Sequence, residues 1–194
     1  MEKVIIYGSR EFAQIVKNLV EICGHKFIGY IDDFEPHRDQ VIGTFKDVVN
    51  NYSHEDYKIV NALGYNNLQV RWNIQSKIKN NGYETINLIH PKATIDHNSH
   101  LGNGNIIMAG AIVEMNSRLN DLVVMWPGAI LNHDSEVGNN CFLSPGSNVC
   151  GFVSIGENSF IGASSVIVNN LVVPANSFIK AGSLYSKKKV DKLL

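Results

Sequence analysis

His133 and Asp134 stand side by side in a stretch of the chain that is poor in charge. An imidazole is the usual general base near neutral pH, and a neighbouring carboxylate can orient it and stabilise its charged form. Gly151 follows 18 residues later. An outward imidazole beside a bare backbone N–H suits acyl transfer, because the N–H can bind the reacting carbonyl oxygen. The alternative is a surface histidine beside a surface aspartate.

The stretch that must position these residues repeats every six residues from 89 to 183 without a slip. Its first column is aliphatic or Met at all sixteen positions: Ile89, Ile95, Leu101, Ile107, Val113, Leu119, Met125, Leu131, Val137, Leu143, Val149, Ile155, Ile161, Ile167, Val173 and Ile179. A second column, four residues after the first, holds Ala, Ser or Cys at twelve of its sixteen positions. This period fits neither an α-helix nor a half-buried strand, and a Val/Ile-rich sandwich would not keep one phase so long.

A period of six is typical of a parallel β-helix, in which three hexads close one triangular coil. The repeat predicts about five coils, stacked at roughly 4.8 Å, so that residues 18 apart lie one above the other. Gly151 is therefore expected directly above His133. Neighbouring residues of a strand point to opposite faces, so a contact between His133 and Asp134 requires a corner of the coil or a neighbouring subunit.

A shared metal ion is not expected on this β-helix. His97 precedes His133 by two coils in the same column, which puts the two side chains roughly 10 Å apart, too far to bind one ion. His90 and His100 fall at other hexad positions.

The first 87 residues alternate between strand and helix patterns. Strands are expected at 3–7, 26–31 and 58–63, and helices at 11–22 and from 66 or 67 to about 80. Strands that alternate with helices predict a small α/β domain with a parallel, Rossmann-like sheet. We therefore divide the chain into a Rossmann-like domain at 1–87, an all-β parallel β-helix at 88–184 and a basic tail at 185–194.

Two turns of the first domain are candidates for binding a nucleotide. The turn after the first strand, where such folds place a phosphate against a helix N-terminus, holds Gly8, Ser9 and Arg10. Asp32 and Asp33 end the second strand, where a carboxylate commonly meets a ribose or base. The alternative is a solvated turn that carries two acids. Arg71, on the second long helix, is expected at the surface.

Composition excludes several classes of protein. The net charge is −1, with 44% hydrophobic and 18% charged residues, which is ordinary for a globular protein and gives no reason to expect a nucleic-acid partner. Apolar runs are far shorter than the roughly 20 residues that span a bilayer, and no signal peptide opens the chain. The three cysteines, an odd number without paired spacing, favour a reducing compartment, with the cytoplasm as the default.

Several segments together resemble bacterial nucleotide-sugar acetyltransferases that join a Rossmann-like domain to a left-handed β-helix. This group includes UDP- and GDP-4-amino-sugar N-acetyltransferases and sialic acid O-acetyltransferase-like proteins. The resemblance rests on Tyr7-Gly8-Ser9, Phe12-Ala13, Gly29-Tyr30-Ile31-Asp32-Asp33, Leu88-Ile89-His90-Pro91-Lys92-Ala93, Asn132-His133-Asp134, Ser144-Pro145-Gly146 and Val149-Cys150-Gly151.

The resemblance implies a homotrimer, with acetyl-CoA in the groove between neighbouring β-helices and the nucleotide on the first domain. It gives His133 the role of base, Asp134 that of its partner, and Gly151 that of binding the acetyl oxygen. The residues implied to face the nucleotide are Gly8, Ser9, Arg10, Asp32 and Asp33. Those implied to border the pantetheine are Gly162, Ala163 and Ala181, and the lysines of the tail would lie near the CoA phosphates.

The chain departs from the family at three places. Trp126-Pro127-Gly128-Ala129 stands where the family commonly has Asn-Thr-Gly-Ala, and Phe142 replaces a histidine often found nine positions after the base. Both changes predict a more apolar acceptor pocket near the sugar. Arg10 and Glu11 replace two glycines of the phosphate turn.

The sequence thus predicts an acetyl-CoA-dependent N-acetyltransferase acting on a nucleotide-linked 4-amino-4,6-dideoxy sugar for surface polysaccharide or glycan synthesis. Two alternatives stay open: an O-acetyltransferase of a sialic-acid-like sugar, and a non-catalytic trimeric protein that binds a sugar nucleotide.

Overall fold

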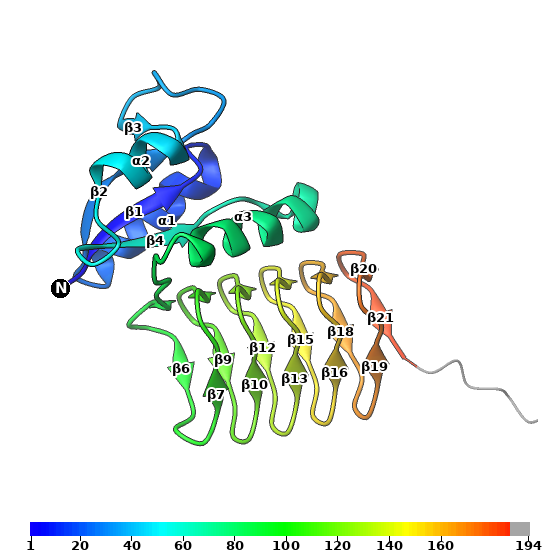
Figure 1. Ribbon diagram of the computed structural model, residues 1–194. Helices are drawn as coiled ribbons and strands as arrows, with labels where there is room; N and C mark the ends of the chain where they lie inside the picture. Colours follow the sequence, from blue (N-terminus) through cyan, green and yellow to red (C-terminus); the bar gives the residue numbers. More distant parts are fainter. Residues whose placement is uncertain (187–194) are drawn as a thin grey trace, which may run out of the picture.

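The computed structural model describes residues 1–186, in which an N-terminal α/β domain packs on a β-helix (Figure 1). The domain holds a parallel sheet in the order β3-β2-β1-β4. Its elements are β1 (Lys3–Tyr7), α1 (Glu11–Ile22), β2 (Lys26–Ile31), β3 (Val41–Gly43), α2 (Phe45–Asn51), β4 (Tyr57–Asn61), the 3₁₀ turn η1 (Tyr65–Asn67) and α3 (Leu68–Asn80). The prediction of a Rossmann-like sheet is confirmed.

The sequence pattern missed β3 and α2. β3 has three residues, too few to show a period. The helix α2 is short but carries a capping box, in which the Thr44 side chain accepts the Asp47 N–H and the Asp47 side chain accepts the Thr44 N–H. That Thr-x-x-Asp spacing is the sequence signal from which α2 was predictable.

The β-helix has three parallel sheets, which form the faces of a triangular prism of about five coils. The first face holds β5 (Leu88–Ile89), β8 (Ile106–Ile107), β11 (Val124–Met125), β14 (Phe142–Leu143), β17 (Phe160–Ile161) and β20 (Phe178–Ile179). The second face holds β6 (Thr94–Ile95), β9 (Ile112–Val113), β12 (Ile130–Leu131), β15 (Asn148–Val149), β18 (Val166–Ile167) and β21 (Leu184–Tyr185). The third face holds β7 (His100–Leu101), β10 (Arg118–Leu119), β13 (Glu136–Val137), β16 (Ser154–Ile155) and β19 (Val172–Val173).

Residues 18 apart pair across neighbouring coils, as the hexad arithmetic predicts. Val124 pairs with Phe142 and Leu131 with Val149. The aliphatic column points inward and forms one continuous core, which is buried from Ile107 onward and partly exposed at the first coil. The small side chains of the second column, such as Ala111 and Ala129, are buried with it.

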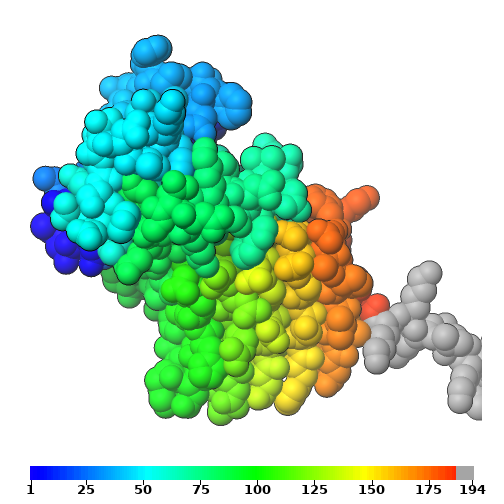
Figure 2. All heavy atoms as spheres, viewed as in Figure 1, coloured from blue at the N-terminus to red at the C-terminus, as the bar shows by residue number. Residues whose placement is uncertain are grey.

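The N-terminal domain covers the first face. On this face the outward position is also apolar, and Leu88, Ile106, Val124 and Phe142 are fully buried against the domain. The matching position of the third face holds His100, Arg118, Glu136 and Ser154. Figure 2 shows the domain seated above the first coils, with the last coils, in orange, extending beyond it.

One expectation about a side chain was wrong here. Arg71 is fully buried, not on the surface, because α3 packs on the edge between the third and first faces. Its guanidinium donates to the Leu122 carbonyl at 2.7 Å and to the Asn140 amide oxygen at 2.6 Å, and lies over the Phe142 ring. Burial lowers the pKa of Arg71 to about 9. This side chain joins α3 to the β-helix.

Within residues 1–186, no helix is long and apolar enough to span a membrane.

Candidate active site

His133 and Asp134 lie at the edge between the second and third faces, which we call the distal edge because it is opposite the first face. Asp134 occupies the left-handed region at φ 57°, so the chain turns there and both side chains reach the same side. Nδ1 of His133 lies 2.9 Å from Oδ2 of Asp134. The contact that the strand geometry would forbid therefore forms within one chain, at a corner.

Two further side chains hold the pair. The Asn116 amide donates to Oδ1 of Asp134 at 3.1 Å, and the Glu114 carboxylate accepts the backbone N–H of His133 at 3.0 Å. Hydrogen bonds from His133 and Asn116 lower the pKa of Asp134 below its ordinary value. A charged carboxylate can only accept, so Nδ1 carries a proton and Nε2 is the basic nitrogen.

Gly151 lies directly against the imidazole, one coil after His133. A Cβ added at position 151 would stand 2.7 Å from Cε1 and 2.9 Å from Nε2 of His133, closer than real contacts allow. Among residues 1–186, no acceptor takes the Gly151 N–H. The geometry therefore offers a basic nitrogen beside an unused backbone donor, which is the arrangement that acyl transfer needs.

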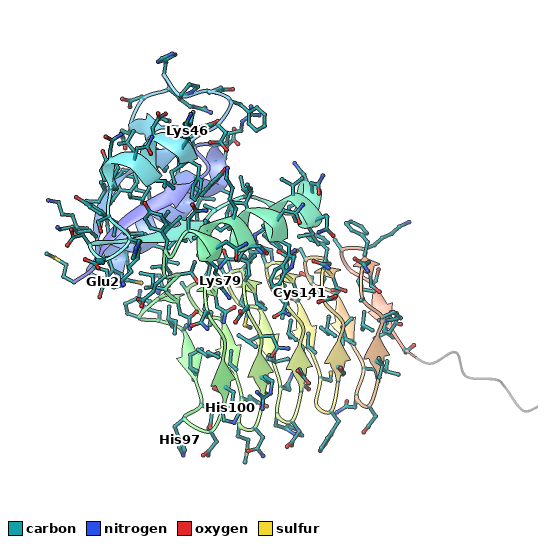
Figure 3. The ribbon with its side chains drawn as sticks, viewed as in Figure 1. Glu2, Lys46, Lys79, His97, His100 and Cys141 are labelled. Carbon is teal, nitrogen blue, oxygen red and sulfur yellow. The ribbon has the colours of Figure 1, made fainter. Side chains whose placement is uncertain are left out.

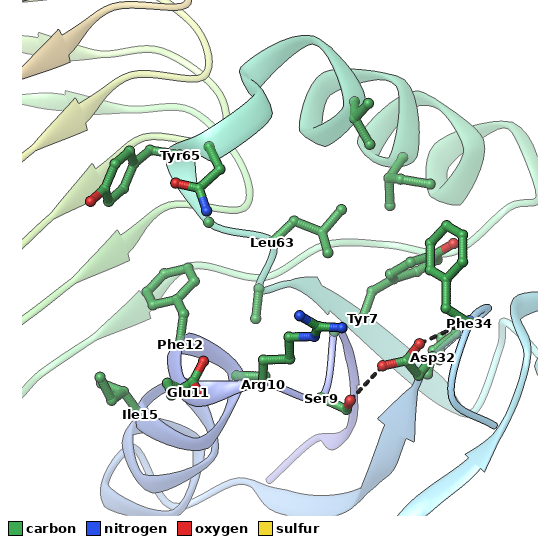
Figure 4. A pocket seen from close by; sticks show the side chains of 18 of the residues that line it. Tyr7, Ser9, Arg10, Glu11, Phe12, Ile15, Asp32, Phe34, Leu63 and Tyr65 are labelled. Carbon is green, nitrogen blue, oxygen red and sulfur yellow. Dashed lines mark hydrogen bonds between the residues drawn. The ribbon is translucent and has the colours of Figure 1, made fainter. Parts of the chain in front are cut away.

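A pocket of about 770 Å³ lies at the carboxyl ends of β1, β2 and β4, beside the first face (Figure 4). Gly8, Ser9, Arg10, Asp32, Asp33 and Trp126 all line it. Arg10 is the N-cap of α1 but supplies no side-chain cap, so the first N–H groups of that helix are free of a capping side chain. Such a helix end attracts an anion.

Asp32 and Asp33 shape the mouth of this pocket. Partial burial would raise the pKa of Asp32, but hydrogen bonds from Ser9 and from the Phe34 and Glu35 N–H groups outweigh it and lower that pKa. Asp33 accepts from the Tyr7 hydroxyl and the backbone of α2. Both carboxylates therefore hold the loops around the pocket.

Phe142 does not reach the pocket, so the prediction that it contacts substrate was wrong. Its ring is fully buried, 6.0 Å from Phe12 and 4.7 Å from the Arg71 guanidinium. The reason is that Phe142 is an outward residue of the first face, which the N-terminal domain covers. Trp126 is half-buried beside Phe12 and lines the pocket.

The structure separates the predicted residues into two groups. Trp126, Gly162, Ala163 and Ala181 lie at the edge between the first and second faces, which we call the proximal edge. A side chain at position 162 would collide with the backbone of Ala181. The pair His133 and Gly151 lies on the distal edge, on which Figure 3 labels His97, away from the N-terminal domain. The lysines predicted near CoA, Lys187 to Lys189 and Lys192, lie outside the described residues.

Several residues of the candidate site were missed from the sequence. Asn116 stands 18 residues before Asp134, so the coil arithmetic itself would have found it. Phe34, Leu63 and Tyr65 line the pocket from loops, whose positions depend on tertiary packing and leave no periodic signal. Within residues 1–186, no group of three or more His, Cys, Asp or Glu could hold a metal ion.

Comparison with known proteins gives two family matches. Residues 3–78 match the PglD N-terminal domain, and residues 134–169 match the bacterial transferase hexapeptide (six repeats). No curated protein gives a significant match to the sequence.

Solved structures resemble nearly the whole chain. PerB from Caulobacter crescentus, in complex with CoA and GDP-perosamine, is 26% identical with a TM-score of 0.88, over 96% of this chain and 89% of that one. The acetyltransferase domain of PglB from Neisseria gonorrhoeae is 28% identical with a TM-score of 0.87, over 96% and 92%. The same domain in complex with acetyl coenzyme A gives 28% identity and a TM-score of 0.85, over 93% and 89%. The chain is therefore similar to hexapeptide-repeat β-helix acyltransferases over nearly its whole length, and its first 78 residues include a match to the PglD N-terminal domain.

Proposed function

We propose that the protein transfers the acetyl group of acetyl-CoA to the 4-amino group of a nucleotide-linked 4-amino-4,6-dideoxy sugar. The observation that carries this proposal is the imidazole of His133, held by Asp134 and pressed against the unused N–H of Gly151. The relatives support the chemical class of both substrates, because PerB was solved with CoA and GDP-perosamine and the PglB domain with acetyl coenzyme A.

In this reaction the sugar amine attacks the thioester carbonyl carbon. The N–C bond forms, the C–S bond breaks, and the amine proton passes to Nε2 of His133. The charge that develops on the carbonyl oxygen is stabilised by the Gly151 N–H. Asp134 stabilises the imidazolium, which then returns its proton to the leaving thiolate of CoA.

The pocket of the N-terminal domain is the proposed site of the nucleotide. The pyrophosphate would meet the start of α1, where Gly8 has φ 111° and a Cβ would press on the Ala62 carbonyl at 3.1 Å. Arg10 pairs there with Glu35 at 3.1 Å, and its guanidinium extends into the pocket (Figure 4). Where the family has two glycines in this turn, Arg10 would offer the pyrophosphate a positive charge.

We further propose that the working unit is a homotrimer with the site shared between copies. Within one chain the pocket opens at the proximal edge, whereas His133 lies on the distal edge. A copy that sets its proximal edge, with Gly162 and Ala181, against the distal edge of a neighbour would bring the pocket, the CoA groove and the base together. Cyclic symmetry lets three copies repeat this contact and close.

We further propose that the reaction takes place in the cytoplasm, which the acetyl-CoA donor and the three free cysteines support. The product would then enter the synthesis of a surface glycan.

The activity is tested by thiol release from acetyl-CoA in the presence of UDP-, GDP- or dTDP-linked 4-amino sugars, with His133→Ala run in parallel. We expect turnover with one of these sugars and its loss in the variant. Equal turnover by wild type and His133→Ala, or none with any sugar despite CoA binding, would refute the proposal.

The shared site is tested by mixing two inactive variants. His133→Ala lacks the base and Arg10→Asp places a negative charge at the proposed pyrophosphate site. If the site is shared, random mixed trimers of equal parts regain about one quarter of the wild-type activity, because each site draws its two halves from different copies. If both halves belong to one copy, the mixture stays inactive.

A further inference from the structure

Phe152 is an exposed aromatic residue in a backbone conformation that does not suit it. It has φ 59°, in the left-handed region, and is 54% exposed. On the same edge this corner position holds Asn116, Asp134 and Asn170, at φ 57°, 57° and 60°. Asn and Asp tolerate the left-handed region, whereas a bulky side chain is strained there.

Burial within its own chain does not explain Phe152. The other large apolar residue with positive φ on the β-helix is Leu122, and it is fully buried, so hydrophobic burial offsets its strain. More than half of Phe152 is exposed in the single chain. Its presence at this corner therefore has a cause other than the stability of the coil.

The one aromatic partner of Phe152 among the described residues is the imidazole of His133. The two ring centroids are 5.3 Å apart and the planes cross at 85°, which is the favourable edge-to-face arrangement. Asp134 holds Nδ1 of the imidazole, and the backbone of Gly151 lies under Cε1 and Nε2. Phe152 therefore closes a third side of the ring and restricts its rotation about the Cβ–Cγ bond.

We propose that Phe152 is a positioning residue for His133. It holds the imidazole in the orientation that keeps Nδ1 on Asp134 and Nε2 beside the Gly151 N–H, and the strain at φ 59° is retained for this purpose. The inference rests on the proposed function, since the orientation matters for proton transfer to Nε2. A positioning residue acts on the chemical step, so kcat should respond to its loss and KM should not.

The test is Phe152→Asn, which installs the residue that the same edge carries at positions 116 and 170. We expect the melting temperature to rise by about 2 °C, because the strain is removed. We expect kcat to fall about tenfold, with KM for both substrates within about twofold of wild type. Phe152→Tyr keeps the ring and should restore kcat to within about twofold.

A matched control places the same strain elsewhere. Asn176 is exposed, has φ 60° and lies on the edge between the first and third faces, away from His133. Asn176→Phe should lower the melting temperature by about 2 °C and leave kcat unchanged.

A readout without substrates separates this proposal from the proposed function. In the NMR spectrum of the wild-type protein, the His133 ring protons should give one narrow set of signals shifted by the Phe152 ring. Phe152→Asn should move and broaden them, whether or not an acceptor is known. The proposal is overturned if the variant keeps full kcat, melts at a lower temperature, leaves the imidazole signals unchanged, or loses its oligomeric state by light scattering.

Discussion

Replacing Gly151 by Ala should remove activity while leaving the fold intact. The backbone at 151 is outside the left-handed region, so Ala fits it, but the new Cβ would stand 2.7 Å from Cε1 of His133. To reach ordinary contact at 3.4 Å, the ring must retreat by about 0.7 Å. Such a retreat is enough to lengthen the 2.9 Å bond to Asp134 beyond hydrogen-bond range.

A displacement near 1 Å at a reacting group costs about 100-fold in rate, or about 2.7 kcal/mol of barrier. We therefore expect kcat of Gly151→Ala to fall about 100-fold. The melting temperature should change by less than about 2 °C, because only the end of one side chain has to move.

Gly138→Ala is the matched control, because Gly138 also lies at a corner of the β-helix. Its Cβ would stand 2.6 Å from the backbone nitrogen of Glu157, which cannot move aside. We expect this variant to lose about 2 kcal/mol of unfolding free energy, or roughly 4–8 °C in melting temperature, and to keep its kcat. Steady-state kinetics and thermal unfolding on both variants check the pair. If Gly151→Ala keeps its kcat, or if it loses as much stability as Gly138→Ala, catalysis does not depend on the position of the His133 imidazole beside the Gly151 backbone.

Asp134→Asn should lower kcat about 100-fold with little change in KM, measured by thiol release, because the imidazolium loses its carboxylate. The pKa of Asp134 is lowered by its hydrogen bonds from His133 and Asn116, so any stability it contributes is present above its ordinary pKa and is lost only as the pH falls through the lowered value. A kcat–pH profile should therefore show no loss of activity from protonation of Asp134 above the ordinary pKa of a carboxyl, and a loss there that Asp134→Asn abolishes would contradict this. Arg71→Met should reduce the unfolding free energy by about 3 kcal/mol in urea titrations, because the Asn140 amide and the Leu122 carbonyl lose a charged donor; an unchanged midpoint would contradict the role of Arg71 in joining α3 to the β-helix. Burial raises the pKa of the Cys141 thiol to about 12, so mass spectrometry should find it unmodified by iodoacetamide at pH 8 until the protein unfolds, and rapid modification of the folded protein would contradict the packing.

Periodicity made the β-helix predictable, since each hexad repeats the same inward aliphatic and the same small corner residue. The same arithmetic placed Gly151 against His133. It also held a signal that was not used: the outward residue of every third hexad, as at Leu88, Ile106 and Val124, is apolar and marks the face on which the N-terminal domain packs.

Other parts of the site had no signal in the sequence alone. Burial of Arg71 depends on how α3 meets the β-helix, which no local pattern records. The contact of Phe142 with substrate was wrongly predicted for the same reason, because the residues around Phe142 are distant in sequence. The strain at Phe152 became visible only when its φ could be compared with that of its neighbours on the distal edge.

The most direct test of the central claim is to identify the product. The acceptor found in the panel is incubated with acetyl-CoA and wild-type protein or His133→Ala, and the nucleotide sugar is analysed by mass spectrometry before and after treatment with hydroxylamine, which cleaves esters and leaves amides intact. We predict one added acetyl group that survives hydroxylamine, formed by the wild type and not by the variant. An acetyl group that hydroxylamine removes would show transfer to a hydroxyl, and equal product from His133→Ala would show that the imidazole is not the base.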